Sequence, residues 1–277
     1  MGVKIIVDSS ADLLPEDRAR VGVVPLIVHF GQTEYTDGVT ITAETFYQKL
    51  ADCKELPHTS QASPFAFAEA FDEAVADGSC VVAIIASSEL SGTYQSARIA
   101  AADYPGKVFV VDSQNIALSS GILAHYALRL ADQGMAAEEI ALRVDEAKSK
   151  VHLMAVVDTL EYLQRGGRVS KTAAIAGGLL AIKPIIGIVD GKIQMIGKAR
   201  GNKQANLFMN REAEKLGIDL DMPILLGYTG TEDTLLQKYK EESSDFYGNR
   251  QLPSTIVSAV VGTHAGPGAV ALAFFSK

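Results

Sequence analysis

The sequence has few cysteines, no long hydrophobic run and fewer basic than acidic residues. Cys53 and Cys80 are its two cysteines, too few for a disulfide framework and without the spacing of metal ligands. The richest apolar stretch, 173–188, is interrupted by Lys183 and Pro184 and is too short to span a membrane. The first residues have the pattern of a strand rather than of a signal peptide. These absences favour a cytoplasmic protein in a reducing compartment.

The charge balance excludes one large class of partner. The chain has 25 lysines and arginines against 33 aspartates and glutamates, a formal net charge of -8. Nucleic acids are bound mainly by clustered basic side chains, so nucleic acid is not expected to be the main partner. With 277 residues, of which 48% are hydrophobic, the chain can fill two domains or one large α/β domain.

Motifs for nucleotide, metal and hydrolytic sites are also missing. The glycine-rich segment around His264 lacks the Lys-Ser/Thr ending of a phosphate-binding loop, and the histidines are too scattered for a metal site. No G-x-S-x-G elbow is present. Ser91 or Ser113 could still combine with His264 and with Asp8 or Asp112 in a serine-dependent lipid or ester hydrolase, which is the alternative function. We expect no cofactor and no metal.

The first half of the chain alternates between predicted strands and helices. Apolar runs at 3–7, 80–86 and 107–111 each end in a polar turn, as buried parallel strands do. Ser63 and Pro64 have the pattern of a helix cap and first helical residue. Such alternation implies a parallel sheet with right-handed crossovers, whose ligands bind outside the carboxyl ends of the strands. The predicted helices cover 63–71, 93–102, 116–131 and 137–150.

The second half has a different rhythm. Asp190-Gly191, between apolar runs at 184–189 and 192–196, predicts a hairpin and therefore a mixed or antiparallel sheet. The fold class is thus α/β, with a parallel domain at 1–150 and a mixed-sheet domain at 151–277. The other strands are expected at 151–157, 224–227, 255–261 and 270–275, and helical segments at 159–164, 171–180, 203–216 and 231–239. His264 is expected in the last strand-like stretch, 262–269, at a strand end framed by glycines.

Hydroxyl side chains gather in two segments that lead into predicted helix starts. Thr59, Ser60 and Ser63 belong to the first segment, and 87–93 forms the second. Free backbone N–H groups at helix starts favour an anion. His264 adds a titratable imidazole, framed by glycines that allow close approach of a ligand. Because no cluster of basic side chains accompanies them, these residues suit a carboxylate better than a polyphosphate.

Apolar residues exceed what one helix face requires, so they either fill the core or line a long apolar tunnel. These residues are Phe65, Phe67, Phe71, Leu179, Leu180, Ile182, Ile185, Ile186 and Ile188.

A series of short motifs, in order along the whole chain, resembles the DegV family of bacterial fatty-acid-binding proteins, the FakB-type carriers. The motifs are Asp8-Ser9-Ser10-Ala11-Asp12-Leu13, Tyr35-Thr36-Asp37-Gly38, Thr59-Ser60-Gln61, Leu90-Ser91-Gly92-Thr93-Tyr94-Gln95-Ser96-Ala97, Val111-Asp112-Ser113, Leu160-Glu161-Tyr162-Leu163 with Gly166-Gly167-Arg168-Val169, Ile182-Lys183-Pro184-Ile185, Ala199-Arg200-Gly201 and the His264 segment. The resemblance implies a two-domain DegV-like fold that buries an acyl chain.

The resemblance also implies a function. Thr59, Ser91 and His264 match the family residues that hold the carboxylate of a long-chain fatty acid such as palmitate or stearate. The secondary site residues are Ser60, Gly92, Thr93 and Arg200, of which Arg200 is implicated in presenting the ligand. The family carrier is not itself an enzyme; it presents the carboxylate to a FakA-like fatty acid kinase, which forms an acyl phosphate for phospholipid metabolism.

Release of a buried tail requires a covering element to open, and 160–198 is the candidate because it combines apolar helix faces with paired glycines. Its basic residues predict transient contact with an anionic membrane surface, despite the acidic chain. These residues are Arg165, Arg168, Lys171 and Lys198.

Overall fold

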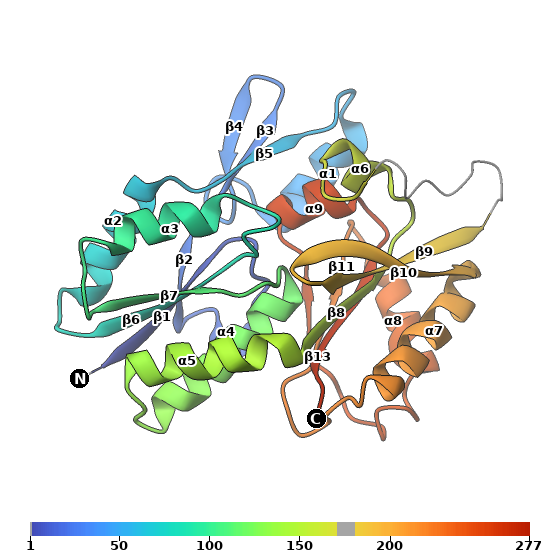
Figure 1. Cartoon of the computed structure of the whole chain (residues 1–277). Coiled ribbons are helices and arrows are strands. Elements are labelled where there is room, and N and C mark those ends of the chain that lie inside the picture. The colour runs from blue at the N-terminus through green and yellow to red at the C-terminus, as the bar shows by residue number, and fades with distance from the viewer. Residues whose placement is uncertain (1, 171–180) are drawn as a thin grey trace.

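The computed structural model of the chain describes residues 2–170 and 181–277 and places two sheets side by side (Figure 1). The elements of the first half are β1 (Val3–Asp8), η1 (Pro15–Asp17), β2 (Val21–Val24), β3 (Ile27–Phe30), β4 (Thr33–Thr36), α1 (Ala43–Asp52), β5 (His58–Ser60), α2 (Pro64–Val75), β6 (Cys80–Ile85), α3 (Thr93–Ala101), β7 (Val108–Asp112), α4 (Leu118–Asp132), α5 (Ala137–Ala147) and η2 (Lys148–Lys150).

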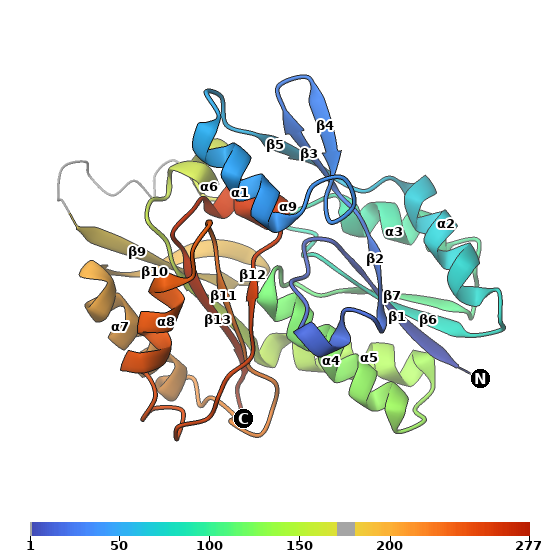
Figure 2. The same ribbon diagram turned by 180° about the vertical axis from the view of Figure 1, so that it is seen from behind.

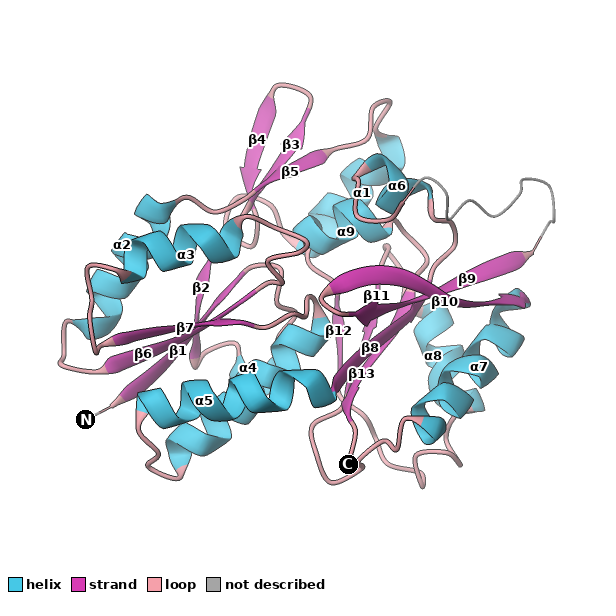
Figure 3. Ribbon diagram, viewed as in Figure 1, coloured by secondary structure: helices cyan, strands magenta, loops and turns pink. Residues whose placement is uncertain are grey.

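The first sheet is entirely parallel, as the sequence predicts, and its strand order is β2-β1-β6-β7. Strand β2 was not among the predicted strands. Helices cover both of its faces (Figure 3). Val82 and Ile84 of β6 pack in one core cluster with α4 and α5, whereas Val81 and Ile85 pack in another with α2 and α3. Burial of both faces explains why these strands are continuous apolar runs.

The cap of α2 also follows the sequence. The Ser63 hydroxyl accepts a hydrogen bond from the Ala66 N–H at 3.1 Å, and Pro64 occupies the first helical position.

A small antiparallel sheet, in the order β4-β3-β5, and helix α1 were not indicated by the sequence. The strands of this sheet have four residues or fewer and carry few fully buried side chains, so their sequences show no clear alternation of apolar and polar residues. The sheet nevertheless positions the candidate site residue Thr59, because β5 pairs with β3 in a register that sets Thr59 opposite Val28.

The second sheet is six-stranded and mixed, in the order β10-β9-β8-β13-β11-β12, and β11 and β12 form its parallel pair. The hairpin at Asp190-Gly191 is confirmed: β9 and β10 are antiparallel, and both turn residues have positive φ. The elements of this half are β8 (Val151–Val156), α6 (Glu161–Arg165), β9 (Ile182–Val189), β10 (Lys192–Arg200), α7 (Gly201–Lys215), β11 (Leu225–Tyr228), α8 (Thr234–Glu242), β12 (Ser254–Ile256), α9 (Ala259–Ala265) and β13 (Val270–Phe275).

The prediction of a strand at 255–261 is wrong beyond Ile256. Helix α9 follows, and His264 lies in its last turn rather than at a strand end. Two buried carboxylates from the other half hold the start of α9: Asp12 accepts from the Ser258 N–H at 2.8 Å, and Asp37 accepts from the N–H groups of Ala259 and Val260 at 3.3 and 3.4 Å. These distant contacts override the strand propensity of the local valines.

Helix α4 packs against both sheets. On one side, a side chain at Gly121 would lie 1.9 Å from the Asp12 carbonyl oxygen, so the two backbones touch. On the other side, the Leu118 side chain would lie 2.8 Å from a Cβ placed at Gly227 of β11. The predicted division into domains at 150/151 therefore stays a prediction, because α4 shares a core cluster with strands of both halves.

The predicted helix at 171–180 lies outside the described residues. Among the helices that are described, none is long and apolar enough to cross a membrane.

Candidate functional site

An apolar pocket is lined by residues that follow β1 and β6 of the first sheet, by strands of the second sheet, and by α6 and α9. These two helices lie together in both views (Figure 1 and Figure 2). The cavity has a volume of about 90 Å³. Aliphatic side chains from several elements line it, which suits an apolar ligand. They include Ile116, Leu118, Leu153, Ala155, Ile186, Ile188, Ile193 and Ala271. Of the apolar residues singled out in the sequence, Ile186 and Ile188 belong to this lining, whereas Phe67 and Phe71 lie in the core.

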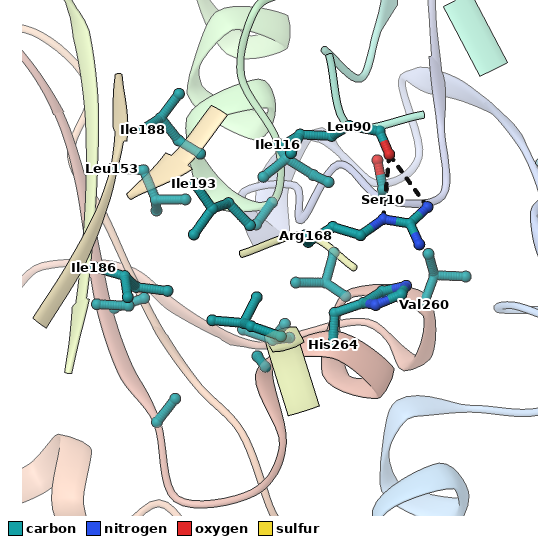
Figure 4. A pocket seen from close by; sticks show the side chains of 18 of the residues that line it. Ser10, Leu90, Ile116, Leu153, Arg168, Ile186, Ile188, Ile193, Val260 and His264 are labelled. Atoms are coloured by element: carbon teal, nitrogen blue, oxygen red, sulfur yellow. Dashed lines mark hydrogen bonds between the residues drawn. The ribbon is translucent and has the colours of Figure 1, made fainter. Parts of the chain in front are cut away.

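The pocket has one polar end. In Figure 4, the His264 ring and the Arg168 guanidinium lie at one side, and Leu153, Ile186 and Ile188 lie at the other. Thr59 and Ser91 also line the pocket. The structure thus brings together the three residues predicted to hold a carboxylate and adds an arginine.

Thr59 and His264 contact each other directly. The Thr59 Oγ1 lies 2.9 Å from the His264 Nε2, and the direction of this hydrogen bond depends on the histidine tautomer. Thr59 is the middle residue of β5 and His264 belongs to α9, so residues from opposite halves of the chain meet here.

Burial and a nearby cation keep the His264 ring neutral. Burial, followed by the charge of Arg168, lowers the pKa of His264 to about 4. The Nδ1 atom is buried and has no hydrogen-bond partner among the described residues. A neutral imidazole can donate one hydrogen bond to a ligand oxygen without neutralising the ligand's charge.

Arg168 is a site residue that the sequence did not reveal as one. Its Nε and Nη2 donate to the Leu90 carbonyl at 3.3 and 3.2 Å (Figure 4). Its Nη1 donates to the Gly166 carbonyl at 2.7 Å. The interpretation of Arg168 as a membrane-facing cation stays a prediction. Its half-buried guanidinium lies at the pocket wall, where it favours an anionic ligand. The Gly166-Gly167-Arg168 motif was the signal that could have indicated this.

Ser91 lies in the turn between β6 and α3. Its Oγ is 2.8 Å from the Thr93 Oγ1 and accepts from the Thr93 N–H at 3.2 Å. Thr93 thus orients Ser91, and its predicted role as a secondary site residue stays a prediction.

Like Thr93, the other secondary residues lie outside the pocket lining. Ser60 is exposed, and its hydroxyl pairs with the His29 Nε2 at 2.8 Å. Gly92 packs against Gln61, whose Oε1 would lie 2.1 Å from an added Cβ. Arg200 is exposed at the end of β10, so the structure does not bring it together with Thr59 and His264. A site role for these three residues stays a prediction.

The geometry does not assemble the hydrolase alternative. The His264 Nε2 contacts Thr59 rather than a serine, and no carboxylate within the described ranges orients its Nδ1. Ser113 is fully buried and donates to the Asn115 carbonyl. Nor does the described part of the chain contain a group of three or more side chains that could hold a metal ion.

Two glycines set the position of the His264 ring. A Cβ at Gly166, just after α6, would lie 2.2 Å from the His264 Nδ1. Reciprocally, a Cβ at Gly266, just after α9, would lie 2.3 Å from the Tyr162 ring of α6. The ends of α6 and α9 therefore approach each other as closely as glycine allows, and Gly166 is a positioning residue for His264.

Replacing Gly166 with alanine should displace the imidazole and break its hydrogen bond to Thr59. We expect the His264 pKa to rise toward its ordinary value and carboxylate affinity to fall about tenfold. Titration of the histidine resonances by NMR and a binding isotherm would measure both. Gly167→Ala is the control. Its backbone would be strained by a positive φ of 73°, but the added Cβ would have no atom within 4 Å. An unchanged His264 resonance in Gly166→Ala would contradict the positioning role.

These features define an α/β protein with an aliphatic pocket whose single polar end can bind an acid. The family described as "Uncharacterised protein, DegV family" matches residues 2–277, so the chain belongs to the DegV family. It is 38% identical to the DegV domain-containing protein TTE1491 of Caldanaerobacter subterraneus subsp. tengcongensis, over 99% of both chains.

Solved structures agree with this assignment. A fatty-acid-binding DegV family protein from Thermus thermophilus superimposes with a TM-score of 0.88, at 30% identity and 100% coverage of both chains. A stearic acid-binding protein from Eubacterium ventriosum gives 0.87 at 29% identity, with 100% of this chain and 99% of the other covered.

Proposed function

We propose that this protein binds a long-chain fatty acid, with the tail in the apolar pocket and the carboxylate at Thr59, Ser91 and His264. The observation that carries the proposal is the 2.9 Å Thr59–His264 pair at the polar end of a mainly aliphatic pocket. Two similar solved structures are named for fatty-acid and stearic-acid binding, which supports it. Arg168 adds a fixed positive charge beside the carboxylate.

The two parts of the ligand contribute differently. Each buried methylene contributes about 0.8 kcal/mol, so a long tail supplies most of the affinity. Each charge-assisted hydrogen bond to the carboxylate contributes about 1.5–3 kcal/mol and fixes its orientation. The head-group residues therefore determine how the acid lies, and the pocket determines how tightly it binds.

The carrier role follows from this orientation. A protein that buries the tail and holds the carboxylate at its polar end can present it to a fatty acid kinase as the phosphoryl acceptor, without catalytic residues of its own. Exposed Arg165 and Lys198 support transient contact with an anionic membrane surface when the acid is exchanged. The protein is thus proposed to be a non-catalytic cytoplasmic carrier.

Alanine at Thr59, Ser91 or His264 should each weaken fatty-acid binding by about 1–3 kcal/mol, because each substitution leaves a carboxylate oxygen without a donor. Displacement of a fluorescent fatty acid would measure the change, and the methyl ester should lose a similar amount with the parent protein. Ser88→Ala is the control, since Ser88 is exposed and its hydroxyl donates to Asp112.

If all three variants bind as tightly as the parent, the head-group assignment is wrong. A fluorophosphonate probe separates the carrier from a serine hydrolase. The carrier should remain unlabelled, whereas stoichiometric labelling of one serine would support the hydrolase.

A further inference from the structure

A second, polar cleft adjoins the head-group end of the pocket. This outer cleft has a volume of about 420 Å³, and Lys54, His58, Tyr162 and Arg165 are part of its lining. It lies at the surface, because Lys54, His58 and Arg165 are exposed.

The outer cleft and the apolar pocket share a wall. Thr59, Arg168 and His264 line both of them. A carboxylate held by these residues has its tail on the inner side, so any group added to a carboxylate oxygen must extend into the outer cleft.

The outer cleft carries positive charge on an acidic protein. Lys54 forms no hydrogen bond or ion pair with any residue that the structure describes, so its ammonium group is available to a ligand. Arg165 pairs with Glu161 at 2.7 Å, but the two side chains are 64% and 53% exposed, and exposed pairs of this kind are weak. Arg168 supplies a third cation, against one carboxylate in the lining, Glu55.

We propose that the outer cleft binds the phosphoryl group of an acyl phosphate, with Lys54 and Arg165 as its ligands. This site rests on the proposed function. In the reaction, a carboxylate oxygen attacks the γ-phosphorus of a nucleoside triphosphate held by the kinase. A carboxyl O–P bond forms, the bond from the γ-phosphorus to the β,γ-bridging oxygen breaks, and the nucleoside diphosphate leaves.

The charge change explains why this site needs cations. The ligand passes from a monoanionic carboxylate to an acyl phosphate with a dianionic phosphoryl group. The aliphatic pocket cannot solvate the added charge, whereas lysine and arginine donate charge-assisted hydrogen bonds to phosphoryl oxygens. The carrier would then retain the product through its tail and its phosphoryl group together.

A long-chain β-ketophosphonate tests this site without the kinase, because its phosphonate lies just beyond the carbonyl as in an acyl phosphate. Affinities for this probe and for palmitate would be compared in the parent, in Lys54→Ala with Arg165→Ala, and in Lys107→Ala, a control for charge at an exposed position outside the cleft. We expect the double variant to bind the phosphonate about tenfold more weakly, and to bind palmitate within twofold of the parent.

The salt dependence of phosphonate binding should also decrease in the double variant. Equal phosphonate affinity in the parent and the double variant, or an equal loss for both ligands, would overturn the phosphoryl site. Failure of the parent to bind palmitate would instead overturn the proposed function on which it rests.

Discussion

Protein purified from its expression host is expected to carry a long-chain fatty acid, and removal of that acid should lower the free energy of unfolding by several kcal/mol. A ligand that binds the folded state alone, at a thousand times its Kd, stabilises that state by about 4 kcal/mol. Native mass spectrometry of the purified protein would identify the acid. Thermal unfolding before and after delipidation would measure its contribution.

The length of the added acid provides the control. Because tail burial supplies about 0.8 kcal/mol per methylene, re-added acids should raise the melting temperature increasingly with chain length until the pocket is full. Short acids such as butyrate should have little effect. A protein that carries no acid, and whose melting temperature no fatty acid raises, would be inconsistent with the carrier function.

Replacing Asp12 with asparagine should stabilise the protein at alkaline pH. Burial, reinforced by the charge of Asp37, raises the pKa of Asp12 to about 7, and burial raises that of Asp37 to about 6. The Asp12 Oδ1 accepts from Ser258, whereas its Oδ2 has no partner among the described residues. Two carboxyl groups at the start of α9 therefore resist ionisation together.

The sign of the pH effect follows from these shifts. The folded pKa of Asp12 lies above its ordinary value of 3.8, so the folded state binds more protons between pH 3.8 and about 7. Its contribution to stability is complete below pH 3.8 and is lost as the pH rises through 7. His264 acts oppositely: its folded pKa of about 4 lies below 6.5, so stability is lost as the pH falls from 6.5 toward 4.

Asp12→Asn should therefore raise the free energy of unfolding at pH 8 by on the order of 1–4 kcal/mol, and by a smaller amount at pH 5, where only part of the loss has occurred. Urea denaturation at both pH values would measure this difference. Asp103→Asn is a suitable control because Asp103 is exposed. If Asp12→Asn destabilises the protein equally at pH 5 and pH 8, the Asp12 carboxyl group is ionised in the folded state at both pH values. That outcome would contradict the raised pKa.

The elements that the sequence predicted well have local causes. The apolar runs at β1 and β6 are buried on both faces, and β13 spans Val270–Phe275 as expected. The β9–β10 turn is specified by Asp190 and Gly191, which adopt φ values of 50° and 73°. In contrast, α9 depends on Asp12 and Asp37, more than 200 residues earlier in the chain, and no local pattern indicates it.

The site residues likewise include some that the sequence predicted and one, Arg168, that it did not. The resemblance selected Thr59, Ser91 and His264, and the fold brings all three to one pocket. Arg168 was visible only as a positive charge, because its direction is set by the Leu90 and Gly166 carbonyls that accept its hydrogen bonds. Sequence can indicate which residues bind an anion, but backbone acceptors decide which way an arginine faces.

Helix α4 restricts how the two halves can move. Gly121 touches the backbone of Asp12, and Leu118 fills the space above Gly227, so a hinge motion that separated the sheets would break one contact or the other. Clamshell closure, in which two lobes rotate apart to admit a ligand, is therefore unfavourable here. A fatty acid must instead pass between elements of the pocket wall, while the two sheets keep a fixed relative orientation during every exchange of ligand.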